Sequence, residues 1–208
     1  MSIEAPHFQY GAWRERRIAR IIEHYGPWFF RDKTLVELAC GYGDIGRVFE
    51  SLGAKVTYAE PRQEHLAVIK DRYPAAHTVE WDAEKDWTLG QFDVCFHMGL
   101  LYHVDKWEEN LRAAAQNCHH MVLETEVMDS IDPLACKKID EAGPDQSIHG
   151  KGSRPSPANV ERVLRDVGMR FCICNDHRLD SGSHRYSWTH QLDDSTNQGA
   201  RRFWFCTK

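Results

Sequence analysis

The length, composition and charge of the chain exclude several classes of protein. Its 208 residues are 42% hydrophobic, which suits a single domain, expected over residues 1–208, with a sizeable core. With 26 basic and 31 acidic residues the formal net charge is -5, so the net charge of the molecule does not attract nucleic acid. No signal-peptide core is present, and no run nears the roughly 20 apolar residues that span a bilayer. We therefore expect a cytoplasmic protein without a membrane partner.

The seven cysteines form an odd set without paired CxxC spacing. This argues against a disulfide framework and against a structural zinc site, whose ligands stand at regular short spacings. We predict free thiols in a reducing compartment and no bound metal.

Strand and helix patterns alternate as far as residue 126. An amphipathic helix is expected over residues 11–26, because Ile18, Ile21 and Tyr25 recur at helical spacing before Gly26. The expected strands are 34–39, 55–59, 77–81, 92–98 and 120–125, and the apolar positions of the helices between them fall within 45–52, 66–73 and 107–118. This alternation predicts an α/β fold with a parallel sheet and helices on both faces.

The pattern loosens over residues 127–155, which we expect to be a long loop. Ser156 and Pro157 then predict a helix start, with serine as the cap and proline in the first turn, and Gly168 predicts its end. The remaining elements are two closing strands, 170–174 and 202–206, and the insertion 175–201 between them. Because long connections in compact domains are often functional, the insertion is a candidate part of the site.

The strongest local signal is a strand that runs into a glycine turn and then into a helix, over residues 35–46. Gly41, Gly43 and Gly46 form a G-x-G-x-x-G pattern, and such glycines let the backbone approach a ligand at the N-terminus of a helix. Glu60 follows at the end of the next strand, placed to accept hydrogen bonds from a ribose. These features predict an adenosine-containing cofactor.

The turn resembles the first motif of class I S-adenosylmethionine (SAM)-dependent methyltransferases, in which an acidic residue precedes a glycine-rich turn. Ala39 stands where that family often has its first glycine, which is a mild departure because alanine is the next smallest residue. The resemblance implies SAM as the cofactor, with S-adenosylhomocysteine (SAH) as the product. The contacts that it implies are Glu37, Ala39, Gly41, Tyr42 and Gly43.

Two further acidic positions match the same family. Glu60, followed by Pro61, matches the ribose-binding acid. Asp82, followed by Ala83, matches the acid after the third strand that faces the adenine amino group. As an alternative to ligand binding, both carboxylates are solvated loop charges.

Residues 92–104 resemble the fourth motif of the family, a strand and turn beside the methionine part of the cofactor. His97, Met98 and Gly99 are the contacts implied there. Residues 98–103 also resemble, locally, the branch that includes tRNA wobble-uridine carboxymethyl-transferring enzymes. The family resemblance covers about residues 35–126 and implies a doubly wound, Rossmann-like sheet of seven mostly parallel strands with one antiparallel strand inserted at the edge.

A nicotinamide-dependent (NAD(P)) oxidoreductase is the alternative enzyme class. The G-x-G-x-x-G pattern suits it, and Tyr102 and Lys106 have the Tyr-x-x-x-Lys spacing of short-chain dehydrogenases. In that family, however, the tyrosine lies on a long helix far from the glycines. Here it directly follows the fourth expected strand, so the methyltransferase interpretation is preferred.

Methyl transfer from a sulfonium is an in-line displacement, so alignment and exclusion of water matter most. His103 is the candidate base if the acceptor must lose a proton, and Tyr102 is a candidate for shaping the methyl site, although both have packing roles as alternatives. The acceptor pocket is expected from helix 11–26, loop 127–155 and insertion 175–201, with Glu124, His149, Tyr186, Trp188 and His190 as candidate lining residues. The aromatic and polar mixture suits a small polar acceptor such as a sugar or nucleoside.

Nucleic acid is the less favoured acceptor. The run from His97 to Leu100 replaces the motif that amino-methylating DNA enzymes need, so DNA is excluded as a partner. The basic residues of the first helix, Arg14, Arg16, Arg17 and Arg20, are interpreted as a solvated face. RNA methylation is kept as an alternative to a small-molecule acceptor.

Overall fold

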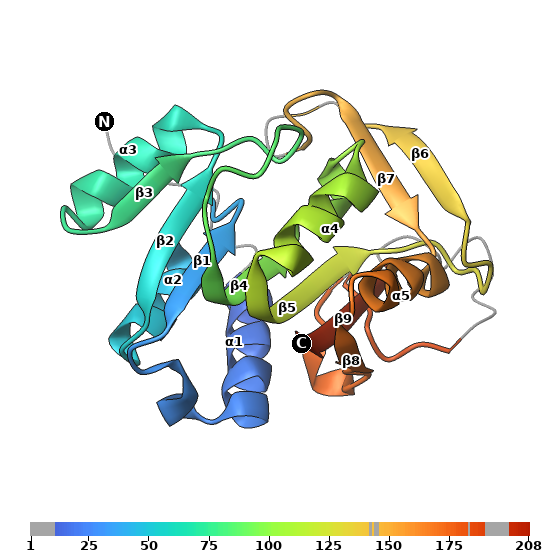
Figure 1. The fold of residues 1–208 in the computed structure, drawn as a ribbon, viewed down its shortest axis with the longest axis horizontal. Coiled ribbons are helices and arrows are strands. Elements are labelled where there is room, and N and C mark those ends of the chain that lie inside the picture. The colour runs from blue at the N-terminus through green and yellow to red at the C-terminus, as the bar shows by residue number, and fades with distance from the viewer. Residues whose placement is uncertain (1–10, 142, 144–145, 183, 190–199) are drawn as a thin grey trace.

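The computed structural model describes residues 11–141, 143, 146–182, 184–189 and 200–208. A seven-stranded sheet in the order β3-β2-β1-β4-β5-β9-β8 lies at its centre (Figure 1). Its strands are β1 (Thr34–Leu38), β2 (Lys55–Glu60), β3 (His77–Glu80), β4 (Phe92–Met98), β5 (Cys118–Glu126), β8 (Arg170–Ile173) and β9 (Arg201–Thr207). The first five are parallel, whereas β9 is antiparallel to both of its neighbours, β5 and β8. The expected doubly wound, Rossmann-like sheet with one inserted antiparallel strand is confirmed.

Helices cover both faces of this sheet (Figure 1). One face carries α1 (Gly11–Tyr25), α2 (Asp44–Ser51) and α3 (Gln63–Arg72), and the other carries α4 (Trp107–Gln116) and α5 (Pro157–Asp166). The described residues also form the short 3-10 helices η2 (Pro27–Phe30), η3 (Leu101–His103) and η4 (His177–Leu179). No helix among the described residues is both long and apolar enough to cross a membrane.

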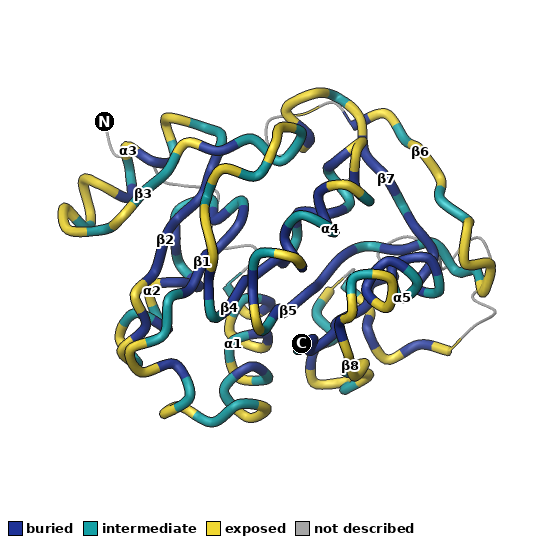
Figure 2. Tube along the Cα trace, viewed as in Figure 1, coloured by how far each residue is buried: buried dark blue, intermediate teal, exposed yellow. Residues whose placement is uncertain are grey.

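The two faces follow from the two-residue period of the strands. In β9, Phe203 and Phe205 pack in the core beneath α1, α2 and α3, whereas Trp204 packs in the core beneath α4 and α5. In β4, Phe96 packs in the core beneath α1, α2 and α3, and Cys95 packs in the core beneath α4 and α5. Figure 2 shows burial running along the central strands β1 and β5. The sheet is thus apolar on both faces. Polar side chains that could bind a ligand are therefore expected at the ends of its strands.

The helix start at Ser156 is confirmed, since its side chain accepts a hydrogen bond from the Asn159 backbone at 3.0 Å. The expectation of an irregular loop over 127–155 is wrong. This segment contains an antiparallel hairpin, β6 (Cys136–Asp140) with β7 (Lys151–Pro155). β6 is largely exposed, and β7 carries small or polar residues. Neither strand therefore shows the apolar alternation that marks a strand (Figure 2). Cys118, expected to end a helix, instead begins β5 and is paired with Phe92.

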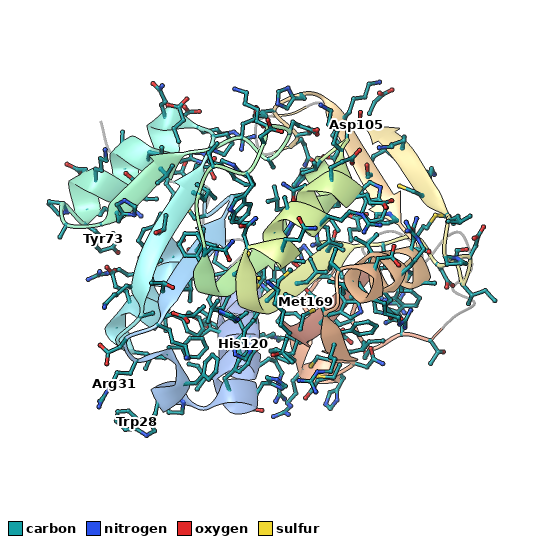
Figure 3. The ribbon with its side chains drawn as sticks, viewed as in Figure 1. Trp28, Arg31, Tyr73, Asp105, His120 and Met169 are labelled. Atoms are coloured by element: carbon teal, nitrogen blue, oxygen red, sulfur yellow. The ribbon has the colours of Figure 1, made fainter. Side chains whose placement is uncertain are left out.

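The β6–β7 hairpin is fixed against the turn that follows β4. The Ser153 hydroxyl donates to the Val104 carbonyl at 2.7 Å, and the Arg154 guanidinium donates to the Tyr102 carbonyl at 2.8 Å. On the exposed side Lys138 pairs with Asp105, labelled in Figure 3, at 2.8 Å. The hairpin therefore covers the carboxyl end of β4, where ligands of open α/β sheets bind.

Gly46 offers a test of how closely α2 packs on β1. A Cβ there would lie 2.5 Å from the Glu37 carboxylate and 2.8 Å from the Tyr58 ring. We expect Gly46→Ala to lower the free energy of unfolding by about 2 kcal/mol, because overpacking outweighs the better helix propensity of alanine. Urea unfolding measures this.

The matched control is Gly11→Ala, also in a helix, where a Cβ would meet nothing within 4 Å. This variant should be at least as stable as the original chain. Equal stability of the two variants would contradict the close packing of α2.

Candidate active site

The turn between β1 and α2 has a left-handed backbone at three alternate residues. The φ angles are +49° at Ala39, +57° at Gly41 and +75° at Gly43. Glycine adopts such angles without a steric penalty, whereas alanine does so at a cost of about 1 kcal/mol. A Cβ on Gly41 would meet nothing within 4 Å, so this part of the backbone faces open space. The turn therefore exposes main-chain groups beside the N-terminus of α2.

Glu60, at the end of β2, holds this turn in place. Its carboxylate accepts the Gly41 backbone N–H at 3.0 Å and is only 1% exposed. Its other oxygen lies 3.2 Å from His65 Nδ1 and accepts the Arg62 backbone N–H at 3.3 Å. The predicted ribose acid is thus brought next to the predicted glycine turn.

A first cavity opens where β1, β2 and β4 end. Nine of the predicted cofactor-binding and catalytic residues line it, namely Ala39, Gly41, Tyr42, Glu60, Pro61, Asp82, Ala83, Gly99 and His103. Other lining residues were not foreseen, among them Arg62, His65, Trp81 and Leu100. The structure therefore gathers segments that are distant in sequence around one cavity.

The tip of the β6–β7 hairpin closes over the first cavity. His149 lies 3.0 Å from the Asp82 carboxylate, and Arg62 donates to the Gln146 carbonyl at 2.6 Å. His149 was expected in an acceptor pocket, but it lines the first cavity. Asp82 is therefore a paired carboxylate at the cavity wall rather than a solvated loop charge.

A second cavity of about 420 Å³ adjoins the first, within the range of about 300–1,000 Å³ of small-molecule sites. The two share Arg14, Ala39, Gly41, Gly99, His103 and Gln146 in their walls. Of the predicted site residues, Glu37, Met98 and Tyr102 line only the second. A ligand can consequently extend from one cavity into the other past Gly41 and Gly99.

Four arginines line the second cavity, and each has an acidic partner. Arg14 lies 3.2 Å from Asp44 in α2. Arg17 and Arg201 both pair with Glu124, at 3.4 and 2.9 Å. Arg154 pairs with Glu126 at 2.9 Å. Burial favours a raised pKa for Glu124, but Arg201 and Arg17 hold its pKa below the ordinary value.

The interpretation of the first helix as a solvated basic face is wrong for Arg17. This side chain is buried, with its guanidinium 3.7 Å from the centre of the Trp13 ring. Trp13, Arg17 and Ile21 are spaced by four residues, so they share the helix face that packs on the sheet. That spacing was the sequence signal for an inward-facing arginine.

Tyr102 and His103 belong to η3, directly after β4. Two guanidinium groups lie close to the centre of the Tyr102 ring, that of Arg154 at 4.8 Å and that of Arg201 at 4.6 Å. His103 lines both cavities and pairs through Nδ1 with the carboxylate of Glu141, which follows β6. His103 is therefore placed between the two cavities, with a partner that sequence reasoning missed.

Two residues predicted to contact the cofactor line neither cavity. Gly43 is packed against Tyr58, whose ring would lie 3.0 Å from a Cβ. His97 is fully buried and bonds to Asn110 at 2.8 Å, and Asn110 in turn donates to the Ala83 carbonyl at 2.9 Å. Burial lowers the pKa of His97 to about 4, so it is neutral near pH 7. Both residues support the cavity walls from behind.

The acceptor-pocket candidates near the C-terminus also take supporting positions. Tyr186 donates to Glu124 at 3.1 Å, and Trp188 donates to the Arg201 carbonyl at 2.9 Å. His184 reaches the second cavity instead, stacked on Trp13. His190 lies outside the described residues. Among the described residues, no three His, Cys, Asp or Glu side chains gather as a metal site.

Comparison with known proteins decides the family. A family model described as a methyltransferase domain matches residues 10–171. The chain belongs to the class I SAM-dependent methyltransferases. SAM is accordingly its methyl donor. A search of curated proteins found no match to its sequence.

Solved methyltransferases share the fold. The N-terminal domain of EvdMO1, crystallised in the presence of SAH and D-fucose, is 18% identical with a TM-score of 0.69, over 97% of this chain and 83% of that one. A SAM-dependent methyltransferase from Mesorhizobium loti is 14% identical with a TM-score of 0.65, over 91% and 96%. The 1,6-didemethyltoxoflavin-N1-methyltransferase of Burkholderia thailandensis, with that compound and SAH bound, is 15% identical with a TM-score of 0.59, over 95% and 77%.

The oxidoreductase alternative fails with this assignment. In the methyltransferase, Tyr102 lies in a 3-10 turn, whereas Lys106 caps the separate helix α4. The two residues therefore do not share the long helix that the dehydrogenase arrangement requires.

Glu37 gives the methyltransferase a testable pH dependence. Burial raises the pKa of Glu37 to about 8, although the carboxylate accepts the Gly46 N–H at 2.9 Å. In the unfolded chain its pKa is about 4.3, so between these values only the unfolded chain releases the proton. Stability from this group is therefore full below about pH 4 and is lost progressively as the pH rises to about 8, by on the order of 4 kcal/mol between about pH 5 and about pH 8.

Glu37→Gln keeps an acceptor for Gly46 and removes the ionisation. Urea unfolding at about pH 5 and about pH 8.5 should show a decline in the unmodified protein that is reduced by this amount in the variant. Parallel declines in both proteins would show that Glu37 ionises normally in the fold.

Proposed function

We propose that the methyltransferase binds SAM across both cavities, with adenosine in the first and the methionine part in the second. The observation that carries this proposal is that Gly41 lines both cavities and has open space where a Cβ would project. Glu60 is assigned to the ribose hydroxyls and Asp82, with Ala83, to the adenine edge. The donor set fits SAM, because it combines ribose and adenine acceptors with the N–H groups of a helix N-terminus.

The proposed acceptor is a small polar molecule such as a sugar or a nucleoside, bound in the second cavity. The polar, aromatic-lined wall and the volume of this cavity support that class. Its walls include α1, β7 of segment 127–155 and His184 of segment 175–201, the three elements expected to form an acceptor pocket. One similar fold was crystallised in the presence of D-fucose, and another has 1,6-didemethyltoxoflavin bound. RNA is less well supported, because Arg14 and Arg17 face inward.

In the proposed mechanism SAM supplies a methyl group on a positively charged sulfur. His103 lies at the boundary of the cavities and accepts the acceptor's proton, while Tyr102 shapes the space around the transferred group. The hairpin tip and α1 enclose the reacting groups, which excludes water and fixes the line of attack. Alignment by the walls is the larger contribution, and proton removal the smaller.

The cofactor assignment is tested by calorimetric titration with SAM, SAH and NAD+. The protein should bind the first two and not the third. Gly41→Asn should weaken SAM binding at least about tenfold, because asparagine tolerates a left-handed backbone and its side chain would occupy the cavity.

The matched control is Gly168→Asn, where φ is +78° and a Cβ also meets nothing within 4 Å. Gly168 lies beyond α5 and lines neither cavity. This variant should bind SAM as the original protein does. Undiminished binding by Gly41→Asn would refute the placement of SAM.

The role of His103 is tested by screening sugars and nucleosides, D-fucose among them, for SAM-dependent methylation. With an acceptor identified, His103→Gln should lower kcat by about 100-fold or more while leaving SAM affinity unchanged. Full activity would show that alignment alone drives transfer. A parallel loss of SAM affinity would instead place His103 in cofactor binding.

A further inference from the structure

Glu141, which follows β6, is held on both of its carboxylate oxygens. Oε2 pairs with His103 Nδ1, and Oε1 accepts a hydrogen bond from Arg154 at 2.8 Å. The residue is 5% exposed, so water does not compete strongly for these bonds. Its orientation toward His103 is therefore set by the protein.

The hairpin that carries Glu141 is shaped to meet the His103 turn. A Cβ on Gly152 would lie 2.6 Å from the Tyr102 carbonyl and 2.7 Å from the Glu141 carboxyl carbon. Only glycine permits this approach, because one of the two obstacles is backbone. Arg154, two residues further on, binds Tyr102 and Glu141 together. The distance between Glu141 and His103 is thus fixed by the packing of β7 on η3.

We propose that Glu141 is the positioning residue for His103 and that the pair serves the methylation of a hydroxyl group. This inference rests on the proposed function. Glu141 accepts a hydrogen bond from the Nδ1–H group of His103. Nε2 therefore keeps its lone pair and is the ring nitrogen available to a ligand in the cavities. The imidazolium formed when Nε2 takes a proton lies beside a carboxylate, which stabilises its charge.

A hydroxyl is the acceptor that needs this arrangement. Its oxygen must lose a proton as it bonds to the methyl carbon, while the electrons of the broken carbon–sulfur bond pass to sulfur. The proton passes to His103 Nε2 and, after the product leaves, to water. A neutral amine attacks without prior proton loss, so it gains less from an oriented base.

The ionised state of Glu141 suits this role. Burial raises its pKa, but hydrogen bonds and charges from His103 and Arg154 outweigh burial and hold the pKa below its ordinary value. Glu141 therefore remains an acceptor for Nδ1 near neutral pH. Arg154 supplies the compensating charge that a buried carboxylate requires.

Nitrogen-15 NMR of the ligand-free protein tests the pair without any acceptor. His103 should carry its proton on Nδ1, identified by the signal that disappears in His103→Gln. In Glu141→Gln the amide oxygen must face Arg154, so the amide N–H₂ faces His103 and moves the ring proton to Nε2. The control is Glu126→Gln, which removes a carboxylate 2.9 Å from the same Arg154 and should leave the His103 signal unchanged.

Kinetics with the acceptor from the screen give the second measurement. Glu141→Gln should lower kcat by about 100-fold, with the dissociation constant of SAM unchanged. Asp140→Asn is the control, since Asp140 ends β6 directly before Glu141 and its side chain is 83% exposed, and the kcat of this variant should match the original. Unchanged kcat in Glu141→Gln, or an Nε2 proton in the original protein, would overturn the positioning role. A methyl group found on nitrogen, sulfur or carbon would overturn the hydroxyl class, whereas failure to bind SAM would refute the proposed function alone.

Discussion

The buried carboxylate of Glu124 is the constraint on which the second cavity depends. It lies at the end of β5, fully buried, and contacts Arg17 of α1, Arg201 of β9 and the Tyr186 hydroxyl. Leaving such a charge without partners would cost about 3–5 kcal/mol. Three segments remote in sequence are therefore bound to one strand end, and a helix outside the sheet becomes a cavity wall.

The gathering of residues around the first cavity could be predicted from the sequence because its signals are local. A strand, a glycine turn and a helix follow one another within a few residues, and the acid of Glu60 stands at the next strand end. In a parallel sheet the carboxyl ends of adjacent strands meet at one edge, so sequence order already implies proximity there. Even so, Gly43 and His97 face packing neighbours, since a motif does not say which way each side chain points.

The acceptor side could not be predicted in the same way. Glu141 and Arg201 acquire their roles from partners across the fold, at His103 and Glu124. The hairpin that carries Glu141 has polar strands stabilised by contacts with η3 rather than by an apolar face. Periodicity reports apolar side chains buried against a core, whereas β6 is mostly exposed and the buried residues of β7 are Gly152, Ser153 and Pro155. Only the spacing of Trp13, Arg17 and Ile21 indicated an inward-facing charge.

This division follows from how the two sides are built. The proposed cofactor contacts use main-chain groups and strand ends, which the sheet positions without help from particular long-range pairs. The second cavity is instead walled by α1, the β6–β7 hairpin and β9, joined by buried ion pairs and one close glycine contact at Gly152. A change in those side chains alters the second cavity, where we place the acceptor, while leaving β1, β2 and their turn intact. The same sheet can therefore hold one methyl donor and serve different acceptors, with specificity residing in elements outside the motifs that identify the family.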